Sequence, residues 1–388
     1  MPQVMFNQIL QTETPVEPAV EKKIALAVRG VSKWFGSDQI LDDVSFSIAE
    51  GELMALLGPS GGGKTTVLRM IAGLENPSSG DILINGKRVN DVSVQQRNIG
   101  FVFQSYALFK TMSVFKNIAF GLRIKKWPRK EIETRVAELL ELLELKGLEK
   151  RYPHQLSGGQ RQRVAIARAL APKPSVLLLD EPFGAVDAKI RQELREWLVR
   201  LHHDLKMTTL FVTHDQEEAM EVSNRIVIIA KGRMEQIGTP RDVYERPENE
   251  FVARFIGVMN ILELDVHNGV GSVGDLHFKL QVPDGPARIG FRPYAVQISP
   301  ELGTYRFRAT LVRTFFLGIM LRIELETEGG ITLRCRMTKE EYAALGLRDG
   351  QKVSFQIRQY RLLARGEEKL GPEVNTVYDV PPMIAEGI

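Results

Sequence analysis

An eight-residue glycine-rich stretch with a lysine near its end limits the possible folds of this chain more than any other part of its sequence. The stretch fits the pattern G-x-x-x-x-G-K-[ST], and its residues are Gly58, Pro59, Ser60, Gly61, Gly62, Gly63, Lys64 and Thr65. It follows the apolar run ELMALL and leads into the amphipathic run KTTVLRMIAGLE. An apolar strand that passes through a glycine loop into a helix predicts an α/β fold built on a mainly parallel sheet.

The same stretch predicts binding of the phosphate tail of a nucleotide. Glycines allow backbone N–H groups to turn toward phosphate oxygens, and the start of the following helix favours negative charge. Lys64 would reach the β- and γ-phosphates, the Thr65 hydroxyl would ligate Mg²⁺, and Thr66 would bond the α-phosphate. Four specified residues match by chance in roughly one chain in a hundred of this length, and the strand–loop–helix order lowers those odds further.

Four polar residues that end or follow apolar runs complete the predicted nucleotide site. In SVLLLDE, Asp180 is placed to hold the magnesium shell, and Glu181 is placed to position and deprotonate the attacking water. Gln104 follows NIGFVF and is a candidate ligand of Mg²⁺ or of water, and His214 follows TTLFVT and is a candidate contact of the γ-phosphate. Each residue alone is more often structural, so the prediction depends on their occurrence together with the phosphate loop.

Two further features have less specific interpretations. Phe35, next to Gly36, is a candidate stacking partner for a base, although one aromatic residue near a strand is more often part of a core. Asp215, Glu217 and Glu218 carry side chains of the type that ligates metals. We interpret them instead as the acidic first turn of a helix, where negative charge is favourable.

Composition and charge exclude several classes of protein. The 388 residues carry a formal net charge of +3, so bulk charge gives no reason to expect a nucleic-acid partner. Cys335 is the single cysteine, which excludes an intramolecular disulfide and a multi-cysteine metal site and predicts an inert core thiol in a reducing compartment. No run of about 18 apolar residues occurs, and residues 1–23 lack the pattern of a secretion signal. We therefore expect a cytoplasmic protein that reaches a membrane only through a partner.

Patterns along the chain predict two domains after a loose N-terminal extension at residues 1–23. Residues 24–257 alternate strands and helices, with a helical insertion at about 105–170. Residues 258–388 are rich in strands separated by Gly, Pro and Asp, which predicts a small β-barrel or sandwich. Within this domain RIGFRPYAVQIS and KVSFQIRQYRLLA are weakly alike, so an internal duplication is one interpretation.

A second glycine-rich turn lies far from the phosphate loop and has no lysine-bearing loop of its own. It opens a basic amphipathic helix pattern, and its residues are Leu156, Ser157, Gly158, Gly159 and Gln160. Locally, Ser157 is a good helix N-cap. The order of all these motifs resembles that of the ATP-binding-cassette (ABC) ATPases over about residues 24–257, and LSGGQ is the specific mark of that family.

In the ABC family two cassettes face each other head to tail, and each signature turn caps the ATP held by the other cassette. The resemblance therefore implies a homodimer that holds two ATP molecules with Mg²⁺ at C2-related composite sites. By the same resemblance Phe35 stacks on adenine, Gln104 senses the membrane partner and Asp187 makes a contact across the dimer. Two departures are visible. Gly62 stands where a serine is common, and GAVD replaces the commoner SALD, so that Gly184 lacks a serine hydroxyl.

Three branches of the family differ in features that the sequence can test. A DNA-repair ATPase needs a long coiled coil before the signature, but only 52 residues separate Gln104 from Ser157. A translation-type protein usually carries two cassettes per chain, whereas this sequence contains one. The β-rich second domain resembles that of bacterial importers, and the stretch Phe183–Ile228 resembles the sulfate/thiosulfate importer ATPases.

The importer resemblance implies a set of partners and a location. The partners are two integral-membrane permease subunits and, indirectly, a periplasmic substrate-binding protein, and the location is the cytoplasmic face of the inner membrane. No residue of this chain would touch the cargo, so molybdate, polyamine and ferric iron are alternatives to sulfate.

Overall fold

The computed structural model describes residues 23–184, 186–363 and 373–375. The chain divides into two compact units, Met1–Pro240 and Arg241–Ile388. The predicted N-terminal extension lies outside the described residues except for Lys23. None of the helices in the described ranges has the length and apolar character needed to cross a membrane.

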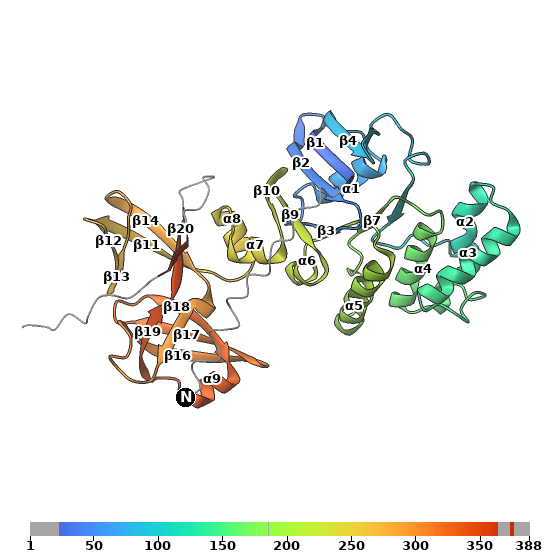
Figure 1. Ribbon diagram of the computed structural model, residues 1–388. Helices are drawn as coiled ribbons and strands as arrows, with labels where there is room; N and C mark the ends of the chain where they lie inside the picture. Colours follow the sequence, from blue (N-terminus) through green and yellow to red (C-terminus); the bar gives the residue numbers. More distant parts are fainter. Residues whose placement is uncertain (1–22, 185, 364–372, 376–388) are drawn as a thin grey trace, which may run out of the picture. The chain divides into compact units, whose positions relative to one another are not determined.

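A six-stranded sheet forms the centre of the first unit, in the order β10-β9-β3-β8-β7-β6 (Figure 1). Its strands are β3 (Leu53–Leu57), β6 (Ile99–Val102), β7 (Val176–Asp180), β8 (Thr209–Thr213), β9 (Arg225–Ala230) and β10 (Arg233–Gly238). Neighbouring strands pair in parallel, except that β9 and β10 pair antiparallel. Every residue of β3, β7 and β8 is buried, which explains why these strands are continuous apolar runs in the sequence. The predicted α/β class with a mainly parallel sheet is confirmed.

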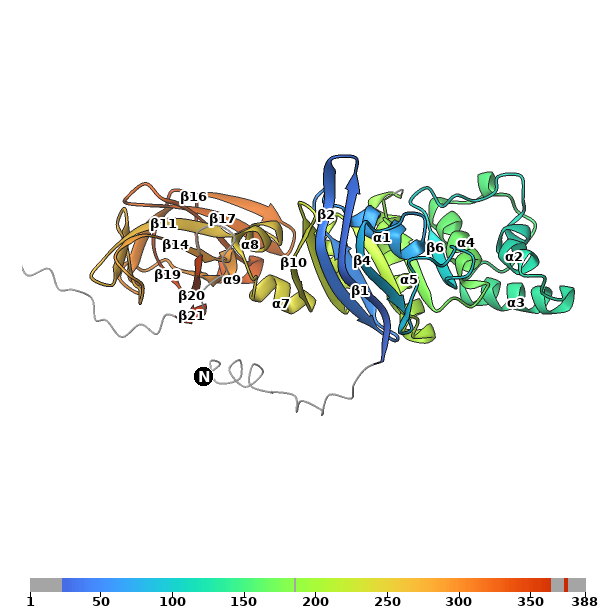
Figure 2. The same cartoon turned by 90° about the horizontal axis from the view of Figure 1, so that it is seen from above.

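An antiparallel sheet in the order β2-β1-β4-β5 completes the strands of this unit. Its strands are β1 (Ile24–Phe35), β2 (Asp38–Ala49), β4 (Ser79–Ile84) and β5 (Lys87–Arg88). Figure 2 shows β1 and β2 as a long hairpin. The two sheets share one hydrophobic core, to which Leu26 and Ile48 contribute from the antiparallel sheet and Leu56 and Val212 from the main sheet. This shared core holds the hairpin against the sheet that carries the phosphate loop.

Helices follow the central strands and also form a separate lobe. Those after β3, β7 and β8 are α1 (Lys64–Ala72), α5 (Ala188–Leu205) and α6 (Gln216–Val222). The lobe consists of α2 (Val114–Ile124), α3 (Arg129–Leu142), η1 (Pro153–Gln155) and α4 (Gly158–Leu170). In the lobe α2 packs against both α3 and α4. Figures 1 and 2 show α2 and α3 on the side of the main sheet away from β10.

Two further sheets form the second unit, with strand orders β13-β12-β11-β14-β20-β21 and β15-β19-β16-β17-β18. The first comprises β11 (Asn260–His267), β12 (Val270–Val273), β13 (Leu276–Lys279), β14 (Gly285–Phe291), β20 (Gln359–Leu363) and β21 (Glu373–Asn375). The second comprises β15 (Val296–Ser299), β16 (Phe307–Leu317), β17 (Met320–Thr327), β18 (Thr332–Thr338) and β19 (Lys352–Ile357). Its helices are α7 (Pro240–Glu245), α8 (Glu250–Phe255), η2 (Pro293–Ala295) and α9 (Lys339–Ala344), with Pro240 itself the last residue of the first unit. The predicted β-rich C-terminal fold is confirmed.

The two weakly alike segments of this unit pair with each other. The segment RIGFRPYAVQIS contains the end of β14 and the whole of β15, and KVSFQIRQYRLLA contains β19 and β20. Because β14 pairs with β20 and β15 pairs with β19, each segment contributes one strand to each sheet. Such reciprocal pairing is what an internal duplication would produce, and the duplication itself stays a prediction.

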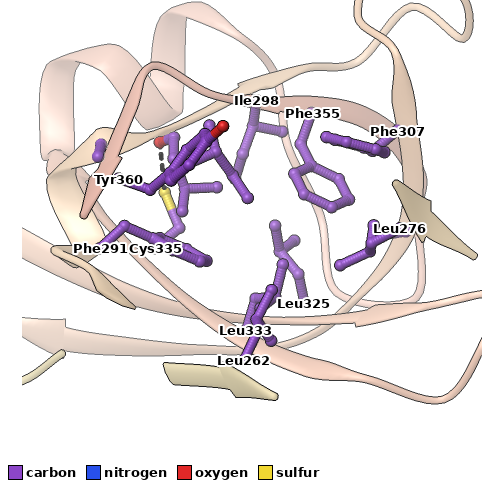
Figure 3. Packing of buried hydrophobic residues seen from close by; sticks show 14 of the residues in the cluster. Leu262, Leu276, Phe291, Ile298, Phe307, Leu325, Leu333, Cys335, Phe355 and Tyr360 are labelled. Atoms are coloured by element: carbon purple, nitrogen blue, oxygen red, sulfur yellow. Dashed lines mark hydrogen bonds between the residues drawn. The ribbon is translucent and has the colours of Figure 1, made fainter. Parts of the chain in front are cut away.

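Cys335 lies in the core between these sheets, as Figure 3 shows. Neighbours in the same cluster include Leu262, Phe291 and Leu333. The thiol donates a hydrogen bond to the carbonyl oxygen of Val296 at 3.2 Å, and burial raises the pKa of this thiol to about 12. A thiol that stays protonated and covered is unreactive at neutral pH, in agreement with the predicted core role.

Arg292 fastens α7 and α8 to the sheets of the second unit. Its side chain is buried, and it donates hydrogen bonds to the carbonyl oxygens of Ala253 at 3.0 Å, Gly257 at 3.1 Å and Tyr244 at 3.0 Å. The guanidinium also lies 4.5 Å from the centroid of the Tyr244 ring. One side chain from the β-rich unit therefore satisfies the carbonyl groups at the ends of both short helices.

We propose that the two units fold independently. Truncated chains test this proposal, and they also distinguish a boundary at Pro240 from one at Gly257. A chain that ends at Pro240 should unfold cooperatively and bind ATP. A chain that ends at Gly257, the boundary predicted from sequence, keeps α7 and α8 without Arg292, so it should melt at a lower temperature or aggregate. Circular dichroism melts and nucleotide binding measure both properties. Higher stability of the chain ending at Gly257 would place the boundary there.

Candidate functional site

The carboxyl ends of four parallel strands bring the predicted nucleotide-site residues to one edge of the main sheet. The phosphate loop leaves β3, Gln104 follows β6, Asp180 ends β7, and His214 follows β8. Parallel strands point the same way, so residues far apart in sequence converge where these strands end.

Backbone geometry shapes the phosphate loop. A Cβ atom added to Gly58 would lie 2.0 Å from the carbonyl oxygen of Ile229, so only glycine fits there. Gly63 has φ of 96°, the left-handed conformation that favours glycine, and it caps the N-terminus of α1. Because an added Cβ at Gly63 would lie 2.5 Å from a methyl group of Leu41, β2 is in close contact with the loop.

The Lys64 side chain is hydrogen-bonded to the backbone of the phosphate loop. Its ammonium group donates hydrogen bonds to the carbonyl oxygens of Gly58 at 2.8 Å and Pro59 at 2.7 Å. Burial lowers the pKa of Lys64, and the nearby charges of Glu181 and Asp180 oppose that shift. A buried cation next to a glycine loop and a helix N-terminus is suited to phosphate oxygens.

Asp180 and Thr65 supply oxygen donors beside that loop. The Thr65 hydroxyl donates to Asp180 Oδ1 at 3.4 Å. Burial raises the pKa of the Asp180 carboxyl, the adjacent charge of Glu181 raises it further, and Thr65 and Lys64 act in the opposite direction. A hydroxyl and a desolvated carboxylate are hard oxygen ligands, so this pair fits Mg²⁺.

Glu181 is held by two of the other predicted residues. Gln104 Nε2 donates to one carboxylate oxygen at 2.8 Å, and His214 Nδ1 lies 3.2 Å from the other. The backbone of Glu181 has φ of 44°, an uncommon conformation for a residue with a side chain, and its N–H donates to the carbonyl oxygen of Val212 at 3.1 Å. Strained backbone of this kind is concentrated at functional sites.

The departure at Gly184 leaves space beside this carboxylate. A Cβ atom at Gly184 would lie 3.6 Å from Glu181 Oε2 and 3.8 Å from Gln104 Nε2, both ordinary contact distances. A serine would therefore fit next to the carboxylate, and glycine leaves the hydrogen bond between Gln104 and Glu181 without a competing hydroxyl.

The signature turn forms the start of α4. Ser157 Oγ accepts from the N–H of Gln160 at 3.2 Å, and the Gln160 side-chain oxygen accepts from the N–H of Ser157 at 2.9 Å, which is a capping box. A Cβ added to Gly158 would lie 2.9 Å from Val186, so this turn lies against the loop that carries Asp187. Asp187 in turn caps α5, because it accepts from the N–H of Ile190 at 3.0 Å.

The predicted residues therefore fall into two groups within one chain. Across the described residues, no hydrogen bond or ion pair joins the turn at Ser157 to the phosphate loop. Phe35 belongs to neither contact network: it ends β1 with 47% of its surface exposed, and the Lys33 ammonium lies 4.6 Å from its ring centroid.

A buried link behind His214 was not predicted from the sequence. The interpretation of Asp215, Glu217 and Glu218 as the capped, acidic start of α6 is confirmed. The Glu218 side chain is buried, however, and it accepts a hydrogen bond from the Thr213 hydroxyl. One available signal was spacing, because Glu218 precedes the buried Val222 by four residues and so shares its helix face.

Comparisons with known proteins find two family models that match parts of this chain. A family model described as ABC transporter matches residues 41–184, and one described as TOBE domain matches residues 306–364. The sulfate/thiosulfate import ATP-binding protein CysA of Thermosynechococcus vestitus is 50% identical over 87% of this chain and 97% of that protein. The protein of the same name from Nitrosomonas europaea is 47% identical over 87% of this chain and 97% of its own length.

One solved structure is also similar. The structure of cbiO1 from Clostridium perfringens, described as part of the ABC transporter complex cbiONQ, has a TM-score of 0.54 and 32% identity. The similarity covers 58% of this chain and 92% of that one.

The raised pKa of Asp180 predicts that Asp180→Asn stabilises the nucleotide-free protein. A carboxyl whose pKa is higher in the folded than in the unfolded state weakens the fold while ionised, and the penalty disappears as the pH falls through the folded pKa. We expect Asp180→Asn to raise the melting temperature at pH 7 by about 2–4 °C. Calorimetry should show this gain shrinking as the pH is lowered.

A matched change separates this effect from simple loss of charge. Asp215→Asn keeps an N-cap of similar quality and should leave the melting temperature within about 1 °C. The explanation is contradicted if Asp180→Asn melts below the parent protein at pH 7.

Proposed function

Since the chain belongs to the ATP-binding subunits of ABC transporters, we propose that it hydrolyses ATP to drive uptake of sulfate or thiosulfate through separate permease subunits. The assignment of sulfate or thiosulfate as the cargo depends on the 47–50% identity, over most of both chains, to proteins named for sulfate/thiosulfate import. An importer ATPase of this type acts together with membrane permeases and a substrate-binding protein. The proposed location is the cytoplasmic face of the inner membrane, where the chain is held by those permeases.

The edge of the main sheet is the proposed site of ATP hydrolysis. Lys64 exchanges its loop carbonyl partners for the β- and γ-phosphate oxygens, and the loop amides hold the remaining phosphate charge. Glu181 takes the proton of the attacking water. Support for this role comes from Gln104 and His214, which contact one oxygen of that carboxylate each and so orient it.

Thr65 and Asp180 are the proposed ligands of Mg²⁺, with Gln104 as a further candidate. The hydroxyl and carboxylate lie 3.4 Å apart at the mouth of the phosphate loop. Bound Mg²⁺ would supply positive charge to the phosphate oxygens. The pKa of Asp180 is raised by burial and by Glu181, so a cation placed here also relieves repulsion between the two carboxylates.

A homodimer completes the site in this proposal. Ser157, Gly158 and Gly159 form a capped helix start with no polar contact to their own phosphate loop. Helix starts favour anions, so this surface is suited to the γ-phosphate held by a second copy. Asp187, next to this turn, makes the contact across the dimer, and the exposed ring of Phe35 stacks on adenine.

Glu181→Gln should convert the protein into an ATP-dependent dimer that does not turn over. The change keeps the shape and removes the base, so hydrolysis should fall roughly 100- to 10,000-fold. ATP binding should persist, because Lys64, Thr65 and Asp180 are unchanged. Light scattering with and without Mg-ATP measures dimer formation, and phosphate release measures turnover.

Adding Ser157→Arg to Glu181→Gln should abolish that dimer, since the long side chain would occupy the half-site for phosphate. Ser113→Arg is the matched control: Ser113 caps α2 with the same backbone angles, φ −66° and ψ 167°, but lies outside the signature. Both changes are made in the Glu181→Gln protein. If the variant with Ser157→Arg still dimerises with ATP, or if the variant with Ser113→Arg loses the dimer equally, the signature turn does not clamp the ATP of the other subunit.

Deletion of the gene should abolish radiolabelled sulfate uptake by sulfur-starved cells, and the Glu181→Gln gene should not restore it. Uptake of molybdate, polyamine and ferric iron should be unchanged. Normal sulfate uptake together with loss of one of the other three would assign the subunit to that cargo instead.

A further inference from the structure

The turn that carries His214 is held from behind by a buried carboxylate. The Thr213 hydroxyl donates to Glu218 Oε2, and the same hydroxyl oxygen accepts from the N–H of Asp215 at 3.0 Å. His214 therefore lies between Thr213 and Asp215, which are joined by a hydrogen bond at the Thr213 hydroxyl. Glu218 is only 4% exposed, and its contacts in the described ranges include no hydrogen bond or ion pair to a predicted phosphate or metal ligand.

Arg191 extends this contact to the loop that carries Asp187. Its Nε lies 4.0 Å from Glu218 Oε1, and its Nη1 lies 3.9 Å from Asp215 Oδ2. On the other side, Nη2 donates to the carbonyl oxygen of Val186 at 3.4 Å. Arg191 is one helical turn after Asp187, whose carbonyl oxygen accepts from the Arg191 N–H at 2.9 Å.

The contact between Arg191 and Glu218 is incomplete in this structure. Arg191 Nε is buried and has no hydrogen-bond partner among the residues that the structure describes. A buried N–H without an acceptor is unfavourable, and Glu218 Oε1 lies about 1 Å beyond hydrogen-bond distance. A small shift of α5 toward α6 would join them.

We propose that Glu218 and Arg191 are positioning residues that couple the loop of Asp187 to the turn of His214. The inference rests on the proposed function, in which Asp187 meets a second cassette and His214 helps to orient the Glu181 carboxylate. When the second copy presses on the loop of Asp187, α5 moves, Arg191 completes its hydrogen bond to Glu218, and Thr213 transmits the change to His214. Each site then responds to closure of the dimer.

Arg195 provides a control for the alternative that this interface only holds α5 and α6 together. Arg195 is on α5 one turn further along, and it joins α5 to α6 through Glu221 at 3.0 Å. Within the described part of the chain, Glu221 contacts neither Thr213 nor the loop of Asp187 through a hydrogen bond or ion pair. Loss of this pair weakens helix packing without cutting the proposed link.

The test compares Thr213→Val with Thr213→Ser in the full-length protein with Mg-ATP. Valine keeps the shape and removes the hydroxyl, whereas serine keeps the hydroxyl. Thr213→Val should lower kcat about tenfold and leave KM for ATP within twofold, because the phosphate loop is unchanged, and Thr213→Ser should restore kcat to within twofold of the parent. Binding of a fluorescent ATP analogue and the melting temperature are measured for each variant.

Arg191→Met tests the other half of the link, with Glu221→Gln as its control. Arg191→Met should lower kcat about tenfold and reduce the Hill coefficient for ATP toward 1, while Glu221→Gln should change neither. If Arg191→Met does not fold, the Thr213 pair still decides. Parental kcat in Thr213→Val, equal losses in Thr213→Val and Thr213→Ser, or equal losses in Arg191→Met and Glu221→Gln would each overturn the inference.

Parallel assays distinguish failure of this inference from failure of the proposed site. If the parent protein does not hydrolyse ATP, or if Glu181→Gln retains activity, the proposed site is wrong and the inference falls with it. If Glu181→Gln is inactive but Thr213→Val turns over normally, only the coupling through Glu218 is overturned.

Discussion

Two adjacent carboxyl groups at the end of a buried strand require the surrounding residues to compensate their negative charge. Asp180 is 8% exposed and next to Glu181, so burial and repulsion both disfavour its charge. Lys64 on the neighbouring loop and the Thr65 hydroxyl offset part of this cost within the chain. In the proposed function, the negative charge that remains uncompensated at this edge of the sheet favours binding of a cation together with the phosphates of ATP.

Backbone conformation keeps the second carboxylate available. Glu181 leaves the strand in a left-handed conformation, and its N–H stays bonded to Val212 of β8. The side chain is thereby turned toward Gln104 and His214, which come from the two neighbouring strand ends. Movement of either neighbour would change the orientation of the carboxylate. In the proposed mechanism, the helical lobe beyond Gln104 and the turn behind His214 could therefore both influence hydrolysis.

The second unit is stabilised by interactions of its own. Its core joins side chains from both sheets, and Arg292 fastens the two short helices that begin it. The reciprocal pairing of β14 with β20 and of β15 with β19 links those sheets through the segments that are alike in sequence. These contacts lie within the unit, as the proposed independent folding of the two units requires.

The sequence by itself determined the central strands, the phosphate loop and the polar residues at the strand ends, because these depend on local patterns and on the common direction of parallel strands. The tertiary structure alone decided which side chains meet. Glu218 was interpreted from sequence only as part of an acidic helix start, and its contact with Thr213 depends on how α6 packs behind β8. Arg191 and Arg292 are similar cases, since their partners are set by the packing of separate elements, which no local pattern encodes.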